Sequence, residues 1–408
     1  MSYQAFAPVL DWGGHVTKII VEMGQPVSAI PEKELAEKFR VHVYKIDQQT
    51  GLVAMTPKSF FSKAVVPAVG SVDVLSAYPC DADGNPADES EYVLLETDYG
   101  PTKPYSALAY QKNGFTTLSD WRCTIEYEGK VIANRGELIL EGKELVETGV
   151  SASGLNMAWV KPQMENAHPP LIIWLHGAGE GGWDPYVAIL GNKVINLASK
   201  EIQSYFGGAW LLAPQCQTMW MDNGSGKYTR TGKSKYTTAL MDTIEEFVAA
   251  HPEIDRSRIY IGGCSNGGFM TMRMIIDYPE YFAGAYPVCE ALYDETISDR
   301  DIENIKHLPI WFTHAKVDTI VPPEETAVPT YKRLIAAGAE NVHFSYYERV
   351  LDQTGRFKKE DGTPFEYFGH GSWIYTLNND CKLDFDGSPV LLNGQPTTIF
   401  EWLAAQRK

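Results

Sequence analysis

The second half of the chain alternates between two hydrophobic patterns, and this alternation restricts the fold more than any other feature. From about residue 152, short apolar runs such as PLIIWLH, RIYIGG and LPIWFTH are separated by amphipathic stretches such as TTALMDTIEEFVAAH. A strand that is apolar on both faces needs helices on both sides of its sheet. We therefore predict an α/β domain over residues 152–408, with a mostly parallel sheet flanked by helices.

Residues 1–151 show a different pattern. Short strand-like runs such as FRVHVYKI, EYVLLET and WRCTIEYEG lie between clusters of Gly, Pro, Asn and Asp. About seven such runs without strong helical periodicity are typical of an immunoglobulin-like β-sandwich, although another small all-β module has the same pattern. A chain of 408 residues also exceeds the usual size of one hydrophobic core. We predict two domains, an all-β sandwich followed by the α/β domain.

A short glycine-rich turn joins one predicted strand of the α/β domain to a helix. The strand RIYIG continues into Gly263-Cys264-Ser265-Asn266-Gly267, and an apolar helix follows. This is the context of a nucleophile elbow, in which glycines leave room for a sharp turn. The motif alone is common by chance, so the prediction depends on the flanking strand and helix. We expect Ser265 to be a nucleophile at the N-terminus of the helix, where the helix dipole favours developing negative charge.

A second glycine-rich loop, HGAGEGG at residues 176–182, follows the apolar run LIIWL. Such a loop can aim a backbone N–H at the oxyanion of a tetrahedral intermediate, and we assign this role to Gly177 or Ala178. The N–H of Asn266 would be the second donor. A plain turn is the alternative. A phosphate cradle is disfavoured because the sequence lacks both a G-x-G-x-x-G fingerprint and a Walker pattern.

A serine hydroxyl needs a base to remove its proton and an acid to orient that base. Asp318 follows the predicted strand LPIWFTH, and His370 lies after the last strand and before the final helix. These positions fit the order serine, acid, histidine of an α/β-hydrolase. Glu290, at the end of the preceding strand, is the alternative acid. His314, four residues before Asp318, is expected to be structural or to support the acid.

Five segments, HGAGEGG, APQC, GCSNGG, THAKVD and GHGSW, occur in an order that resembles the prolyl-oligopeptidase-like esterase branch of the α/β-hydrolases. The resemblance covers most of residues 155–408. This branch includes feruloyl-esterase-like and polyhydroxyalkanoate-depolymerase-like enzymes, and some of its bacterial carboxylesterases carry an N-terminal immunoglobulin-like domain. The resemblance implies that Ser265, Asp318 and His370 hydrolyse carboxylic esters through an acyl-enzyme. Ala315 stands where the family often has glycine, a small change that leaves the assignment of Asp318 intact.

Within the esterases, short-chain acyl or aromatic esters are the expected substrates and a polymer-active feruloyl or polyester esterase is an alternative. Two functions of other classes also stay open at the level of the sequence. The same three residues can cleave a peptide bond when a subsite holds a peptide, so a serine peptidase is one alternative. A non-catalytic binding protein is the other, although serine, acid and histidine are all present in order. The chemistry expected of these residues needs no metal ion and no cofactor.

Three tryptophans, Trp183, Trp220 and Trp373, lie close in sequence to the predicted site segments. All three are on predicted loops, which this fold gathers at the edge of the sheet where the active site forms. Each is interpreted either as lining of an apolar substrate cleft or as part of the core.

The formal net charge is −17, and the sequence has no stripe of Lys and Arg. This charge disfavours nucleic acid and anionic membranes as partners, and a small-molecule ester is the expected one. The first residues lack the basic and apolar regions of a signal peptide, and no apolar run is long enough to span a bilayer. We expect either a cytoplasmic protein or the trimmed mature form of a secreted one.

The N-terminal domain is expected to shield the active site or to mediate homo-oligomer assembly.

The six cysteines are scattered and form no C-x-x-C pair, which indicates neither a zinc site nor a dense disulfide framework. Most are expected to be buried thiols. Cys80 and Cys123, both in the N-terminal part, are a candidate disulfide pair that their spacing alone does not decide.

Overall fold

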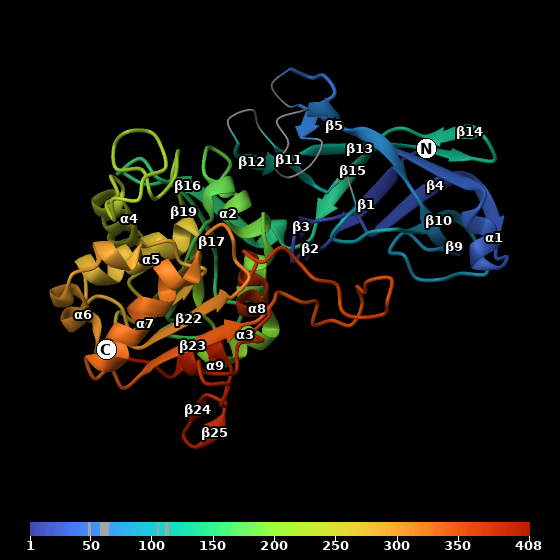
Figure 1. The fold of residues 1–408 in the computed structure, drawn as a ribbon. Coiled ribbons are helices and arrows are strands. Elements are labelled where there is room, and N and C mark those ends of the chain that lie inside the picture. Colours follow the sequence, from blue (N-terminus) through green and yellow to red (C-terminus); the bar gives the residue numbers. More distant parts are fainter. Residues whose placement is uncertain (48–49, 58–64, 104–105, 111–113) are drawn as a thin grey trace. The chain divides into compact units, whose positions relative to one another are not determined.

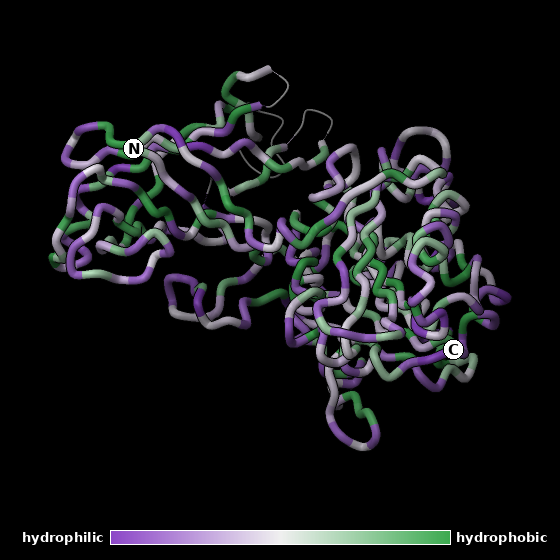
Figure 2. The backbone as a smooth tube through the Cα atoms, turned by 180° about the vertical axis from the view of Figure 1, so that it is seen from behind, coloured by the Kyte–Doolittle hydropathy of each residue, from purple (hydrophilic) through white to green (hydrophobic). Residues whose placement is uncertain are grey.

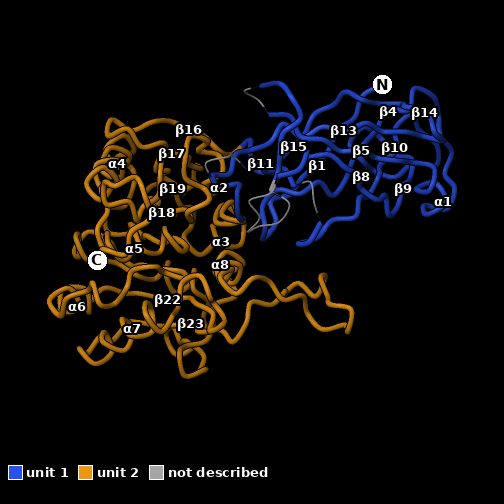
Figure 3. The backbone as a smooth tube through the Cα atoms, turned by 45° about the horizontal axis from the view of Figure 1, so that its top comes forward, with its two compact units in different colours: residues 1–144, 190–192 blue, residues 145–189, 193–408 orange. Residues whose placement is uncertain are grey.

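The chain forms two compact units (Figures 1 and 3). The computed structural model describes residues 1–47, 50–57, 65–103, 106–110 and 114–408. Unit 1 comprises Met1–Glu144 and Leu190–Asn192, and unit 2 comprises Leu145–Ile189 and Lys193–Lys408.

The division between the units falls a few residues before the boundary expected between residues 151 and 152. Strand β16 (Val146–Val150) pairs antiparallel with β17 (Asn156–Val160), which makes β16 an edge strand of the large sheet in unit 2. The turn between them is closed by the Ser151 N–H, which donates to the Leu155 carbonyl at 2.9 Å. A hairpin of unit 2 therefore occupies the position where the sequence pattern changes.

Unit 1 is the predicted immunoglobulin-like sandwich, built from a five-stranded and a four-stranded sheet. Buried and exposed residues alternate along β5, because one face of the strand lies in the core and the other faces outward. The Tyr3 hydroxyl accepts the Cys123 N–H at 2.8 Å and so joins the two sheets. The sheets, in spatial order, are β15 (Gly136–Leu140), β1 (Tyr3–Ala7), β4 (Lys18–Ser28), β10 (Glu89–Thr97) and β9 (Val74–Cys80), and then β14 (Lys130–Ala133), β13 (Asp120–Tyr127), β5 (Phe39–Ile46) and β8 (Val69–Val72).

Smaller elements complete the described part of unit 1. They are helix α1 (Glu32–Ala36), the 3-10 turn η1 (Lys143–Leu145), and three two-stranded pairs: β2 (Val9–Leu10) with β3 (Gly13–Gly14), β6 (Met55–Pro57) with β7 (Val65–Pro67), and β11 (Leu108–Tyr110) with β12 (Thr116–Leu118).

The proposed disulfide between Cys80 and Cys123 is absent, and both thiols are free. Cys80 lies on β9 of the five-stranded sheet, whereas Cys123 lies on β13 of the four-stranded sheet. Both side chains are fully buried. The two cysteines are therefore separate core residues of the sandwich.

Unit 2 contains an eight-stranded sheet in which β17 alone runs against the other strands. The central strand β18 is buried along its whole length, as predicted for a strand covered on both faces. Figure 2 shows hydrophobic colouring along these inner strands. The spatial order is β16, β17, β19 (Trp210–Gln215), β18 (Leu171–Leu175), β20 (Ile259–Cys264), β21 (Gly284–Val288), β22 (Ile310–Ala315) and β23 (Val342–Tyr347).

Helices cover both faces of this sheet, which confirms the α/β prediction. On one face, Ile259 and Ile261 of β20 join an apolar cluster with residues of α4 and α5. On the other, Tyr260 contacts Phe206 of α3, and Tyr286 contacts Phe400 of α9. The α-helices are α2 (Val187–Leu190), α3 (Lys200–Phe206), α4 (Thr237–Ala250), α5 (Asn266–Asp277), α6 (Asp299–Ile305), α7 (Ala327–Ala336), α8 (Trp373–Leu377) and α9 (Ile399–Ala404).

Short elements lie between the helices and strands of unit 2. They are the 3-10 turns η2 (Ala178–Glu180), η3 (Lys193–Ala198), η4 (Asp294–Thr296) and η5 (Pro323–Glu325), and the hairpin of β24 (Leu391–Leu392) with β25 (Gln395–Pro396). Among the described helices of both units, none has the length and apolar character needed to cross a bilayer.

The free thiols lead to a prediction about redox behaviour. Burial raises the pKa of Cys80 to about 11 and that of Cys123 to about 12, which suppresses the reactive thiolate. We expect Ellman's reagent to leave the native chain almost unmodified and to react with six thiols after denaturation, since all six cysteines are buried. Dithiothreitol should leave the melting temperature unchanged. A fall in melting temperature on reduction would contradict the free-thiol assignment.

Candidate active site

Ser265 occupies a strained turn between β20 and α5. Its backbone has φ 57° and ψ −115°, a conformation that side-chain-bearing residues adopt only when the surroundings impose it. Two backbone hydrogen bonds hold the turn. The Ser265 N–H donates to the Val288 carbonyl at 2.9 Å, and the Phe269 N–H donates to the Ser265 carbonyl at 2.8 Å. The turn predicted from the glycine spacing is therefore present.

Three glycines make this turn possible by allowing the end of β20 and the start of α5 to approach the neighbouring strands. A Cβ atom on Gly267 would lie 1.9 Å from the Leu175 carbonyl oxygen, and one on Gly263 would lie 2.4 Å from the same atom. A Cβ on Gly268 would lie 2.7 Å from Cα of Glu290. No side chain fits at these distances, so the close contact of α5 with β18 and β21 requires glycine.

The structure brings the three predicted residues Ser265, His370 and Asp318 together. Nε2 of His370 lies 2.8 Å from Oγ of Ser265, and Nδ1 lies 2.6 Å from Oδ2 of Asp318. A carboxylate accepts hydrogen bonds only, so Nδ1 carries the hydrogen and Nε2 is free to accept one from the serine hydroxyl. This arrangement can remove a proton from Ser265 as its oxygen attacks.

Asp318 lies in the loop after β22 and is held by four donors. The N–H groups of Ile320 and Val321 donate to Oδ1 at 2.9 and 3.0 Å, while His314 and His370 contact Oδ2. Burial alone would raise the pKa of Asp318, but these hydrogen bonds, above all that of His314, outweigh burial and hold the pKa well below its ordinary value. Asp318 is therefore a carboxylate at neutral pH.

Glu290, the alternative acid, has no hydrogen bond to His370 among the described contacts. Its Oε2 accepts the Leu292 N–H at 2.7 Å, and its Oε1 is buried without a described partner. Burial raises the pKa of Glu290 to about 8. The side chain is therefore protonated at neutral pH, unlike Asp318.

The glycine-rich loop after β18 presents one of its two candidate amides. The Gly177 N–H is occupied, because it donates to Oε2 of the buried Glu180 at 3.0 Å. The N–H groups of Ala178 and Asn266 have no acceptor among the described residues. Of the amides named from the sequence, Ala178 and Asn266 are thus the available pair.

The three tryptophans differ in their environments. Trp183 is 74% exposed, and the Trp373 ring lies 5.7 Å from that of His370, almost perpendicular to it. Trp220 is completely buried against the rings of His176 and Tyr236, which supports its interpretation as part of the core. The loop after β19 enters the core at this point, and the Trp220 ring packs against the His176 ring.

Asp222 organises that loop, a role that its place in the sequence did not predict. Its buried carboxylate accepts hydrogen bonds from Gly224, Gly226, Thr218 and Lys235. These bonds outweigh the effect of burial and lower the pKa of Asp222 to about 2. The preceding N–H, that of Met221, donates to the side-chain oxygen of Asn266 at 3.0 Å. The DNGSG segment has the composition of a turn, but nothing local in it indicates a link to the residue after Ser265.

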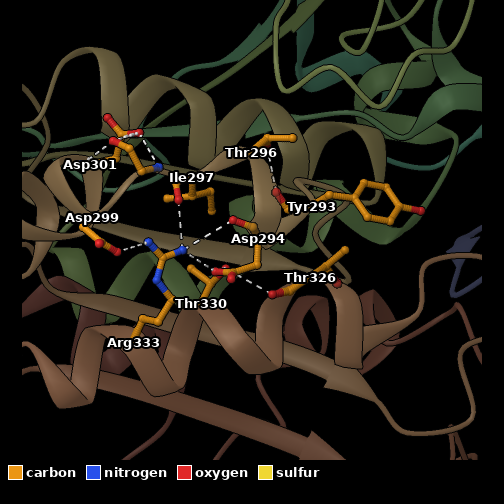
Figure 4. Close-up of polar contacts among 10 residues, drawn as sticks. Tyr293, Asp294, Thr296, Ile297, Asp299, Asp301, Thr326, Thr330 and Arg333 are labelled. Carbon is orange, nitrogen blue, oxygen red and sulfur yellow. Dashed lines mark hydrogen bonds and ion pairs between the residues drawn. The ribbon is translucent and has the colours of Figure 1, made fainter.

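An arginine holds the segment that follows β21 (Figure 4). Arg333 of α7 donates to the Asp294 carboxylate at 2.9 Å, to the Ile297 carbonyl at 3.0 Å and to Asp299 at 2.8 Å. The Thr330 hydroxyl also donates to the Asp294 carboxylate, at 2.9 Å. This network fixes the chain between β21 and α6, immediately after Glu290.

A metal centre finds no support in the site's side chains. Within the described part of the chain, no three His, Cys, Asp or Glu side chains are grouped so that they could hold a metal ion.

Two protein families match the chain in consecutive segments. Residues 2–140 match the family described as Esterase Ig-like N-terminal domain, and residues 157–354 match the family described as Phospholipase/Carboxylesterase. The second match contains Ser265 and Asp318 and ends before His370.

Two characterised enzymes are similar to parts of the chain. Acetylxylan esterase A of Aspergillus awamori is 25% identical over 206 residues, which are 49% of this chain and 60% of that protein. Poly(3-hydroxyalkanoate) depolymerase C of Paucimonas lemoignei is 28% identical over 161 residues, which are 36% of this chain and 33% of that protein. The chain thus spans less than two thirds of the length of either relative.

The chain is similar along its whole length to a solved structure. It is described as a thermostable esterase and is 22% identical, with a TM-score of 0.68 and complete coverage of both chains. This likeness supports the two-domain fold.

The glycine contacts predict a stability effect. Gly267→Ala places a methyl group 1.9 Å from the Leu175 oxygen, so α5 must move away from β18. We expect the free energy of unfolding to fall by about 3 kcal/mol, with loss of the Ser265 geometry. Gly284→Ala is the matched control, because its nearest contact is the flexible end of Leu403 at 3.1 Å and its cost should be about 1 kcal/mol or less. Urea unfolding measures both, and equal losses would contradict the argument.

Glu290 predicts a pH effect on stability. Its pKa is about 8 in the folded chain against an ordinary 4.5, so between these values the native state binds one proton more than the unfolded state. Stability must then fall as pH rises through this window. Glu290→Gln removes this titration. The free energy of unfolding of the variant, relative to that of the parent, should therefore rise by roughly 1 kcal/mol per pH unit between about pH 5 and 8. Urea unfolding at pH 5, 6.5 and 8 tests this, with Glu340→Gln, at an exposed position, as control. If the difference in free energy of unfolding between the Glu290 variant and the parent were the same at all three pH values, Glu290 would not be a buried neutral acid.

Proposed function

We infer that this carboxylic ester hydrolase, which joins an esterase immunoglobulin-like domain to a phospholipase/carboxylesterase domain, works as a serine esterase through an acyl-enzyme on Ser265. The observation that carries the proposal is the hydrogen-bonded series from Ser265 through His370 to Asp318 on a strained turn. This combination of a nucleophile, a base and an acid that orients the base is what acyl transfer requires.

In the first half of the reaction, Oγ of Ser265 attacks the ester carbonyl while Nε2 of His370 takes the hydroxyl proton. The carbonyl oxygen becomes an oxyanion, for which the N–H groups of Ala178 and Asn266, which have no acceptor among the described residues, are the proposed donors. The tetrahedral intermediate then collapses. The bond to the alkoxy group breaks, and His370 returns its proton to the departing alcohol.

In the second half, water repeats the attack on the acyl-enzyme. His370 accepts a proton from the water, the Ser265 ester bond breaks, His370 returns the proton to Oγ of Ser265, and the carboxylic acid leaves. In both halves His370 becomes a cation beside Asp318. The low pKa of Asp318 keeps its carboxylate charged, so it stabilises that cation and holds the ring in place.

We propose short-chain acyl or aromatic esters as the substrates. The relative named acetylxylan esterase supports the short acyl groups in this proposal. Trp183 and Trp373 are the apolar surfaces that we assign to the substrate, since one is exposed and the other contacts the His370 ring.

A substrate panel tests the reaction class. We expect turnover of p-nitrophenyl acetate, p-nitrophenyl butyrate and methyl ferulate, and little or no cleavage of peptide p-nitroanilides. Cleavage of the anilides alone would refute the esterase proposal and favour a peptidase.

Ser265→Ala is expected to reduce kcat by at least about 10⁴-fold, because the nucleophile is removed while the fold is retained. A fluorophosphonate probe should label the parent and leave the variant unlabelled. The melting temperature of the variant provides the control for folding. A parent chain that the probe does not label would favour a non-catalytic binding function.

A further inference from the structure

His314 is a buried histidine that the reaction described above does not use. It is the fifth residue of β22 and has no exposed surface. Its Nε2 lies 3.0 Å from Oδ2 of Asp318 and 3.1 Å from the Val321 carbonyl oxygen. Its Nδ1 is buried and has no partner among the described residues.

These contacts determine which ring nitrogen carries the hydrogen. The Val321 carbonyl and the Asp318 carboxylate can only accept, so Nε2 must be the donor to both. A second hydrogen on Nδ1 would create a buried N–H without an acceptor, together with a buried positive charge. His314 is therefore a neutral ring with its hydrogen on Nε2, and burial, the largest influence on it, lowers its pKa accordingly.

Two histidines thus donate to one carboxylate oxygen. The distances to Oδ2 are 2.6 Å from Nδ1 of His370 and 3.0 Å from Nε2 of His314. The negative charge that stabilises protonated His370 is therefore shared with a second, permanently neutral donor. Removing that donor would leave more charge on Oδ2, and His370 would hold its proton to a higher pH.

The other titratable groups near Asp318 and His370 do not donate a hydrogen bond to the Asp318 carboxylate as His314 does. Cys289 is fully buried, and burial raises the pKa of its thiol far above the working range, so it stays neutral. Lys316, on the same loop as Asp318, forms an ion pair with Glu348 at the surface. Protonated Glu290 donates nothing to Asp318 or His370 among the described hydrogen bonds.

We propose that His314 is a positioning residue that moderates the charge of Asp318 and thereby sets the pH above which His370 acts as the base. The proposal rests on the proposed esterase reaction, since it concerns the acid and base of that reaction. The described contacts of His314 include Asp318 but not Ser265, so we assign its effect to Asp318.

The test is the pH dependence of kcat/KM with p-nitrophenyl acetate. In His314→Phe, which removes the donor, the acidic limb should move to higher pH by about one unit. Activity should then fall about tenfold near pH 6 and remain close to the parent near pH 9. His314→Gln restores an amide donor at the position of Nε2, so its acidic limb should return to that of the parent.

His343→Phe is the matched control. His343 lies on the neighbouring strand β23 and also bonds an aspartate, with Nδ1 2.7 Å from Oδ2 of Asp384, but it has no described contact with the site. Its loss should leave the pH profile unchanged. Titration of active sites with the fluorophosphonate probe gives the concentration of folded enzyme in each preparation, and melting temperatures show whether each variant is folded.

Three outcomes separate this proposal from the proposed function. An inactive, unlabelled parent would refute the esterase function itself. An active parent with an unmoved acidic limb in His314→Phe would overturn the role of His314 alone. If the variants do not fold, ¹⁵N spectra of the parent decide, because His314 must stay neutral with its hydrogen on Nε2 between pH 5 and 9. Titration of His314, or a hydrogen on Nδ1, would overturn the proposal.

Discussion

The close approach of helix α5 to strand β18 is the contact on which the site depends. It brings the backbone of Gly267 against the Leu175 carbonyl, where any side chain would collide. Because the helix starts directly beside the end of β18, Ser265 adopts its strained conformation, and the glycine-rich loop after β18 borders the same turn. That loop is braced in turn by the strand on its other side, since the Gly182 N–H donates to the Cys216 carbonyl at 2.9 Å.

Parallel strand order explains how distant residues meet. β20, β21 and β22 are consecutive in the sheet, so Ser265 after β20 and Asp318 after β22 lie at the same edge with β21 between them. His370 comes from the chain after β23 and reaches the site through another glycine contact. A Cβ on Gly369 would lie 2.5 Å from the Val317 carbonyl oxygen, so the loop with the base lies directly against the loop with the acid.

Buried carboxyl groups in and around the site are in two different states, and hydrogen bonds determine which. Asp318 and Asp222 each receive four hydrogen bonds, which offset the cost of burial and keep both groups ionised. Glu290 accepts one described bond and is protonated at neutral pH. The number of donors thus explains why Asp318, beside His370, is charged, whereas Glu290, two residues after the adjacent strand β21, is not.

Local patterns in the sequence were enough to predict the two domain classes, the turn at Ser265 and the order of serine, acid and histidine along the chain. These features depend on hydrophobic period, glycine spacing and position along the chain, which are visible without a structure. Tertiary structure alone decided that the Gly177 amide is taken by Glu180, that Trp220 is core, and that Cys80 and Cys123 lie on different sheets. It also decided the shared contact of His314 and His370 with Asp318. Such features depend on which loops contact one another in the folded chain. Contacts between segments far apart in sequence cannot be predicted from the local pattern of either segment.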